Sequence, residues 1–216
     1  MLNIFISGLE RQTGKTLVTS GLAATMQSLS YSTSVYKPIQ TGAKILNGFK
    51  SSPDLSVIKR IDSNINTLST YMISGSESPF VSAYEDKVSI SIDTIFNEYR
   101  TMSNLTECNI VEGSNSIASP IADNMTEVDI IRGLRLPLVL VINPSKTSMD
   151  KVLMGLNYIT SNKINLLGVV INQYNENSEN LEEKYFPQIL KEYTEGVNIL
   201  GSLPDYGDTS KLAPEV

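Results

Sequence analysis

The chain has 216 residues, of which 41% are hydrophobic and 19% are charged, an ordinary balance for a globular protein. Its net charge of −6 argues against nonspecific binding to nucleic acid, which needs a basic surface. The chain has no histidine, which excludes imidazole acid–base catalysis, Ser-His-Asp triads and histidine metal sites. Any chemistry must therefore come from Lys, Asp, Glu, hydroxyl groups or a bound metal ion.

No apolar run approaches the roughly 18 residues that a membrane span needs. Residues 1–5 lack the basic region of a signal or transit peptide, so we expect a cytoplasmic protein with no membrane partner. Cys108 is the one cysteine and is expected to be a small buried residue. No linker or repeat divides the chain, so residues 1–216 are predicted to form a single domain.

The first motif is Gly8-Leu9-Glu10-Arg11-Gln12-Thr13-Gly14-Lys15-Thr16, which lies between a strand predicted over residues 2–6 and a helix predicted over residues 17–26. A glycine-rich loop in this setting cradles phosphate, because its backbone N–H groups and the helix N-terminus face an anion. Lys15 can lie along the β- and γ-phosphates, and the Thr16 hydroxyl can bind Mg²⁺. The alternative is an ordinary strand-to-helix turn, since five residues instead of four separate the two glycines.

A second strand is predicted over residues 33–36, and Pro38 should stop regular structure after it. Lys37 then lies at the carboxyl end of this strand, where open α/β sheets bind their ligands. Its ammonium could meet an anion beside the phosphate loop, although a lysine at a strand end is by itself more often a solvated charge.

Residues 43–52 are polar and contain glycine, which predicts a mobile loop. A helix follows over residues 53–60, and Asp54 near its start has two possible roles. It could cap the helix or complete the Mg²⁺ shell begun by Thr16. The spacing alone favours the cap.

Residues 68–74 are predicted as a strand, residues 76–80 as a turn-rich segment and residues 90–99 as a helix. Residues 108–113 then predict a buried strand with Glu112 near its carboxyl end. Phosphate-loop proteins place a second acidic group near Mg²⁺ in this way. The alternative is a glutamate that stands at a strand end by chance.

Strands and helices alternate over the rest of the chain. The predicted segments are a loop over residues 114–120, helices over 128–134, 149–159 and 181–193, strands over 136–143, 164–173 and 197–203, and a cap or loosely held tail over 205–216. This alternation predicts an α/β fold with a mostly parallel central sheet and helices on both faces.

Several fragments occur in the order found in dethiobiotin synthetases, and the chain resembles that family over nearly its whole length. The fragments are residues 8–16, Tyr36-Lys37-Pro38-Ile39-Gln40-Thr41-Gly42, Asp54, Ser78-Pro79, Val111-Glu112-Gly113, Pro120-Ile121, Gly168-Val169-Val170-Ile171-Asn172 and Leu203-Pro204. The Lys-Pro-Ile-Gln-Thr-Gly run is the most specific, because many ATPases and GTPases share the phosphate loop. The resemblance implies a P-loop NTPase-like fold.

The resemblance also implies a reaction, the ATP- and Mg²⁺-dependent closure of the ureido ring of dethiobiotin in biotin biosynthesis. The substrates would be 7,8-diaminopelargonic acid and CO₂, and the intermediates a carbamate and a carbamic-phosphoric anhydride. Lys15 and Lys37 would hold the carbamate and the transferring phosphoryl group, and Thr41 would contact the diamine. A homodimer is implied as well.

The resemblance further implies the binding residues for the cofactors. Those for Mg²⁺ are Thr16, Asp54 and Glu112. Those for the ATP phosphates are Gln12, Thr13, Gly14, Lys15, Thr16 and Leu17. Asn172 and the segment Ser202-Leu203-Pro204 would face the adenine.

Two stretches depart from the family pattern. The family loop usually reads Gly-Thr-Asp-Thr-Glu/Asp-Val-Gly-Lys-Thr, whereas this chain places a new cation, Arg11, and a neutral Gln12 near the phosphates. The family usually continues with Gly-Ala-Gly-Gly after Glu112, whereas residues 113–116 here are Gly-Ser-Asn-Ser. A divergent nucleotide-binding homologue with a regulatory role or another substrate is therefore the alternative. A partitioning-type ATPase is disfavoured, because Glu10 occupies the place of the second lysine of those proteins.

Overall fold

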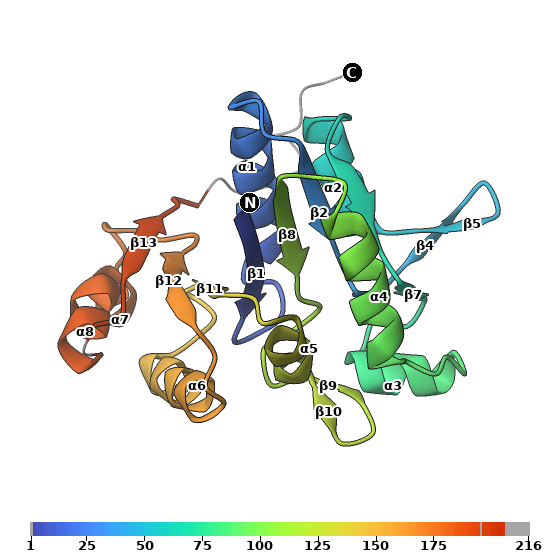
Figure 1. Ribbon diagram of the computed structural model, residues 1–216. Helices are drawn as coiled ribbons and strands as arrows, with labels where there is room; N and C mark the ends of the chain where they lie inside the picture. The colour runs from blue at the N-terminus through green and yellow to red at the C-terminus, as the bar shows by residue number, and fades with distance from the viewer. Residues whose placement is uncertain (1, 195, 206–216) are drawn as a thin grey trace.

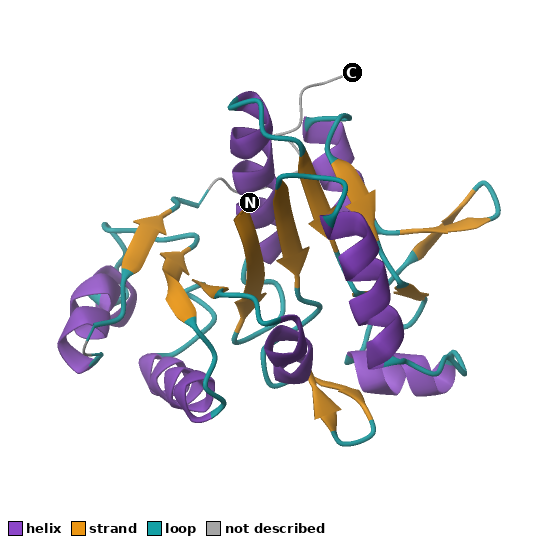
Figure 2. Cartoon of the chain, in the orientation of Figure 1, coloured by secondary structure: helices purple, strands orange, loops and turns teal. Residues whose placement is uncertain are grey.

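The computed structural model describes residues 2–194 and 196–205. Within these ranges a seven-stranded sheet forms the centre of the molecule, with every neighbouring pair parallel (Figures 1 and 2). In spatial order its strands are β13 (Ile199–Ser202), β12 (Leu166–Ile171), β11 (Leu138–Ile142), β1 (Leu2–Gly8), β8 (Cys108–Glu112), β2 (Thr33–Tyr36) and β6 (Asn66–Leu68). All carboxyl ends therefore share one edge of the sheet.

Helices cover both faces of this sheet, as the sequence predicted (Figure 1). On one face lie α1 (Lys15–Ser28) and α2 (Pro53–Ile61); on the other lie α4 (Ile92–Ser103), α5 (Glu127–Leu134), α6 (Met149–Ser161) and α8 (Phe186–Tyr193). Strand side chains alternate between the two layers. In β1, Ile4 and Ile6 pack with α1, whereas Phe5 packs into the opposite cluster. The α/β fold class is therefore confirmed.

Residues 43–52 form a hairpin, and the prediction of a mobile loop was wrong. Its strands are β4 (Lys44–Leu46) and β5 (Phe49–Ser51), and it projects from the body of the molecule (Figure 1). Asn47 and Gly48 at its turn have φ angles of 51° and 83°. Two-residue hairpin turns favour positive φ at both positions, and Asn-Gly supplies it at little cost. This dipeptide was the signal for the hairpin.

Residues 68–74 do not form one strand. β6 ends at Leu68, and β7 (Tyr71–Ile73) pairs instead with β3 (Ile39–Thr41) in a separate two-stranded sheet. Regular structure thus resumes directly after Pro38. The turn-rich segment at residues 76–80 runs into α3 (Pro79–Glu85), with Pro79 at the first helical position, where its missing N–H costs nothing.

Two places in the second half of the chain differ from what was expected: a segment for which no element was predicted and one predicted helix. A hairpin of β9 (Pro120–Ala122) and β10 (Met125–Thr126) precedes α5. The helix predicted over residues 181–193 is divided into α7 (Leu181–Lys184) and α8, because Pro187 fits only the first turn of a helix. The tail predicted over residues 205–216 lies, from residue 206 on, outside the described residues.

Cys108 is fully buried, as predicted. Of the helices in the described part of the chain, none combines the length and the apolarity that crossing a bilayer demands.

Candidate active site

The phosphate loop connects β1 to α1, as its sequence predicted. Gly14 immediately precedes α1 with φ 91°, a backbone region that glycine adopts without strain. A Cβ at this position would lie 1.9 Å from Asn172 Nδ2, so the close approach also requires glycine. Asn172 follows β12, and its Nδ2 donates to the Thr13 carbonyl at 2.9 Å. Asn172 therefore holds the backbone of the loop from the neighbouring strand end.

Lys15 is the first residue of α1 and is buried, with 5% of its surface exposed. Its Nζ donates to the carbonyl oxygens of Glu10 at 3.1 Å and Asn115 at 2.5 Å. Burial lowers the pKa of Lys15 to about 8, although the carboxylates of Glu127 and Glu112 oppose this change. A phosphate at the loop would replace these carbonyl groups as the partner of the ammonium.

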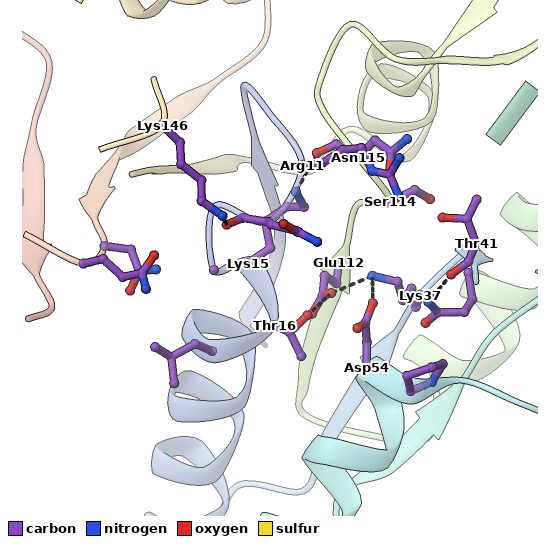
Figure 3. Close-up of a pocket in the computed structure, with 17 residues that line it drawn as sticks. Arg11, Lys15, Thr16, Lys37, Thr41, Asp54, Glu112, Ser114, Asn115 and Lys146 are labelled. Atoms are coloured by element: carbon purple, nitrogen blue, oxygen red, sulfur yellow. Dashed lines mark hydrogen bonds and ion pairs between the residues drawn. The ribbon is translucent and has the colours of Figure 1, made fainter. Parts of the chain in front are cut away.

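Lys37 follows β2, at the position that the sequence predicted, and is only 2% exposed. Its Nζ forms ion pairs with Asp54 Oδ2 and Glu112 Oε1, each at 2.6 Å (Figure 3). It also donates to the Gly113 carbonyl at 3.3 Å. Burial alone would lower the pKa of Lys37, but the two carboxylates outweigh it and raise the pKa above its usual value. The ammonium is therefore charged at neutral pH.

Asp54 does not cap α2, so the prediction from spacing was wrong. Ser52 takes that role, because its Oγ accepts from the Leu55 N–H at 3.1 Å. Asp54, one residue inside the helix, instead faces Lys37. Burial would raise the pKa of Asp54, but the Lys37 ammonium holds it below the ordinary value.

The three predicted magnesium ligands lie around Lys37 (Figure 3). Thr16 Oγ1 donates to Glu112 Oε1 at 2.8 Å. Asp54 and Glu112 each form an ion pair with the Lys37 ammonium. Glu112 Oε2 is buried and has no hydrogen-bond partner within the described residues. Hydroxyl and carboxylate oxygens suit Mg²⁺, and a cation would compensate the unpartnered oxygen.

Among the residues that the structure describes, no group of three or more His, Cys, Asp or Glu could hold a metal ion. Mg²⁺ at this site would therefore take further oxygen atoms from phosphate or water, which is its usual mode of binding beside phosphate loops.

These residues surround a cavity of about 420 Å³. The predicted site residues that line it are Gln12, Gly14, Lys15, Thr16, Leu17, Lys37, Thr41, Asp54, Glu112 and Asn172. Thr13, the loop residue before Gly14, is fully buried and does not line the cavity. The predicted adenine segment does not line this cavity; Pro204 lines a neighbouring cavity of about 400 Å³, which shares Gln173 with the first.

Two basic side chains of the cavity, Arg11 and Lys146, were not among the predicted binding residues. Lys146 lies in the loop after β11, and its Nζ donates to the Gln12 carbonyl at 3.1 Å. Its position past a strand's carboxyl end was a signal that could have found it. Arg11, predicted near the phosphates, lines the cavity and donates to the Ser76 carbonyl.

A parallel sheet, a glycine-rich loop at the start of α1 and a carboxylate at the end of a neighbouring strand together define a P-loop nucleotide-binding protein. A family model described as an AAA domain matches residues 2–212. The chain belongs to this family, which is the domain family of the dethiobiotin synthetases.

The chain is similar to curated relatives over most of its length. It is 26% identical over 216 residues to the ATP-dependent dethiobiotin synthetase BioD of Nitrosopumilus maritimus (strain SCM1), covering 99% of this chain and 93% of the relative. It is 28% identical over 209 residues to the enzyme of the same name from Bacillus velezensis (strain DSM 23117 / BGSC 10A6 / LMG 26770 / FZB42), covering 94% and 87%.

Solved structures show the same fold. A ParA family ATPase from Chlorobium tepidum TLS matches with a TM-score of 0.59 at 14% identity, covering 98% of this chain and 88% of that one.

Proposed function

We propose that this chain is an ATP- and Mg²⁺-dependent dethiobiotin synthetase, a ligase that makes dethiobiotin from 7,8-diaminopelargonic acid and CO₂. The observation that carries the proposal is Lys37. Its buried ammonium, held by Asp54 and Glu112 at 2.6 Å each, lines the same cavity as Lys15 of the phosphate loop. The names of the curated relatives support this reaction.

The reaction needs charge and positioning more than acid–base groups. One substrate amine takes up CO₂ to form a carbamate, and a carbamate oxygen receives the γ-phosphoryl group as ADP leaves. The second amine then attacks the carbonyl carbon, and inorganic phosphate departs. Lys15 and Lys37 would stabilise the negative charge on the carbamate and the phosphoryl group, which is the main form of catalysis in phosphoryl transfer. The absence of histidine is compatible with this chemistry.

The remaining roles follow the same proposal. Thr16, Asp54 and Glu112 would hold Mg²⁺, which supplies compensation for the phosphate charges when bound. Thr41, at the end of β3, would contact the diamine. The nucleotide phosphates would lie on Gln12, Thr13, Gly14, Lys15, Thr16 and Leu17, with Asn172 and the segment Ser202-Leu203-Pro204 towards the adenine. We further propose a cytoplasmic homodimer.

The test is release of ADP by the purified protein. We expect release to require both 7,8-diaminopelargonate and bicarbonate, and to stop when either is omitted. Binding of ATP without any diamine-dependent turnover would refute the proposal. Lys37→Ala should abolish turnover and leave nucleotide binding mostly intact. Lys191→Ala is the matched control, because Lys191 is an exposed lysine on α8 that does not line the cavity.

A second candidate is a homologue that binds nucleotide but uses another substrate or regulates a partner. The observation that favours it is that both stretches that depart from the family pattern form hydrogen bonds to backbone carbonyl groups of other segments. Arg11 donates to the Ser76 carbonyl, and Ser114 Oγ donates to the Ile39 carbonyl at 2.5 Å. Calorimetric titration with the diamine in the presence of a non-hydrolysable ATP analogue distinguishes the two, since only the ligase binds it.

A further inference from the structure

One buried carboxylate near the candidate site has no part in the proposed reaction. Glu127 is the first residue of α5 and is 1% exposed. It is not needed as a cap for its helix, because Thr126 and Asp129 already form a capping box there. A carboxylate is costly to bury without partners, so we expect the two oxygens of Glu127 to have a function at this position.

The two oxygens of Glu127 join two segments that lie far apart in the sequence. Ser7 Oγ donates to Oε1 at 2.5 Å, and the Ser114 N–H donates to Oε2 at 2.7 Å. Ser7 is next to Gly8, where the phosphate loop begins, and Ser114 follows Glu112 by two residues. Figure 1 shows α5 beside the carboxyl ends of β1 and β8, the two strands that Glu127 connects.

The bridge leads directly to the phosphate-loop lysine. Asn115, next to Ser114, accepts from Lys15 Nζ at 2.5 Å, so the segment that Glu127 holds also fixes the ammonium (Figure 3). Gly113 fits between Glu127 and Lys37: a Cβ there would lie 2.2 Å from Glu127 Oε1, and its carbonyl accepts from Lys37 Nζ. The Glu127 carboxylate is also the strongest of the charges that oppose the lowering of the Lys15 pKa by burial.

We propose that Glu127 is a positioning residue, which bridges the end of β1 to the 113–115 segment and thereby sets the position of Lys15 for the nucleotide phosphates. The proposal rests on the nucleotide-binding part of the proposed function and does not require turnover of the diamine. Both hydrogen bonds are needed for this function, because each carboxylate oxygen accepts a hydrogen bond from one of the two segments.

Three variants test whether the two hydrogen bonds of Glu127 have this function. Glu127→Ala removes both hydrogen bonds. Glu127→Gln can keep both, because its amide oxygen accepts from the Ser114 N–H and its amide nitrogen can donate to Ser7 Oγ. Ser7→Ala removes one of the two and leaves the carboxylate in place.

The first measurement is calorimetric binding of Mg-ADP to the full chain, which is informative even if the ligase assay is silent. Glu127→Ala should weaken binding of Mg-ADP about 10- to 100-fold, the loss typical when a residue that orients the binding groups of a site is removed. Ser7→Ala should lie between this variant and the wild type, and Glu127→Gln should bind close to the wild type. Where turnover is present, Glu127→Ala should raise the KM for ATP more than it lowers kcat.

The second measurement is acylation of Lys15 by an amine-reactive ester, followed by peptide mass spectrometry. Lys15 should react faster in Glu127→Ala than in Glu127→Gln, with exposed Lys191 as internal reference. Both variants lack the charge that opposes the lowering of the Lys15 pKa, so the difference between them reports the lost hydrogen bonds. Wild-type binding and labelling in a folded Glu127→Ala protein would overturn the proposal. So would a Glu127→Gln protein as impaired as Glu127→Ala. If Glu127→Ala does not fold, the Ser7→Ala and Glu127→Gln pair gives the same decision.

Discussion

Replacement of Lys37 by methionine tests the centre of the candidate site through protein stability, before any assay of activity. Methionine is unbranched, extends as far as the lysine Cε and lacks the ammonium. In the wild type this ammonium lies 2.6 Å from Asp54 Oδ2 and 2.6 Å from Glu112 Oε1. Its removal leaves two carboxylates close together without a cation between them.

The expected cost follows from the burial of each partner. Loss of one member of a buried ion pair costs about 3–5 kcal/mol, because the other charge stays buried and uncompensated. Glu112, with 1% of its side chain exposed, should bear this full cost. Asp54 is 33% exposed and can be rehydrated, so it adds little. We expect Lys37→Met to lower the free energy of unfolding by about 3–5 kcal/mol, or the melting temperature by about 6–20 °C.

The assay is urea denaturation at pH 7 without nucleotide or divalent metal. The double variant Lys37→Met/Glu112→Gln should recover most of the loss, because the uncompensated charge is gone. Two results would refute the reasoning. One is a single variant within about 1 kcal/mol of the wild type, and the other is a double variant no more stable than the single one. Either would show that the ion pairs do not exist in solution as described.

Three further predictions concern other buried contacts. Gly113→Ala should lower the free energy of unfolding by about 1–3 kcal/mol, because the new methyl group clashes with Glu127. Gly21→Ala is the contrasting variant: its methyl group enters open space on α1, so the free energy of unfolding should rise by up to about 1 kcal/mol. Thermal denaturation measures both. Tyr99→Phe should stabilise the protein by about 1–3 kcal/mol at pH 7, because the described structure gives the buried Tyr99 hydroxyl no partner. Burial also raises the pKa of Tyr99 to about 12. Because an unfolded tyrosine ionises near pH 10 and folded Tyr99 only near pH 12, rising pH favours the unfolded wild type in this interval. The variant has no phenol at this position, so its stability advantage over the wild type should be larger at pH 11 than at pH 7 when urea denaturation is repeated there. Asn172→Ala should weaken Mg-ADP binding by about tenfold in calorimetry, because the Thr13 carbonyl loses its anchor; unchanged affinity would separate Asn172 from the nucleotide site.

The phosphate loop could be predicted because the residues that specify it are close together in the sequence. A glycine that needs positive φ, a lysine and a hydroxyl residue at the start of a helix are all specified within nine consecutive residues, and the structure forms that loop where the pattern predicted it. The positions of Lys37 and Glu112 were also predictable, because a strand end is a local feature and all parallel strands end at one edge of the sheet.

Errors arose where the deciding contact comes from a segment that is distant in the sequence. The spacing favoured Asp54 as the helix cap, but Ser52 caps the helix and Asp54 forms an ion pair with Lys37 instead. Residues 68–74 were apolar enough for one strand, but β7 pairs with β3 outside the main sheet, a choice that depends on a distant segment.

By itself, the sequence determined the alternation of strands and helices in the α/β fold, the phosphate loop and the strand ends that carry Lys37 and Glu112, because each depends on residues a few positions apart. Only the tertiary structure decided which side chains meet. Lys37 pairs with a carboxylate 75 residues away, and Glu127 receives a hydrogen bond from Ser7 across 120 residues. Such pairs depend on how the elements pack and on which charges burial forces to share partners. The spacing of residues along the chain does not show which side chains will meet.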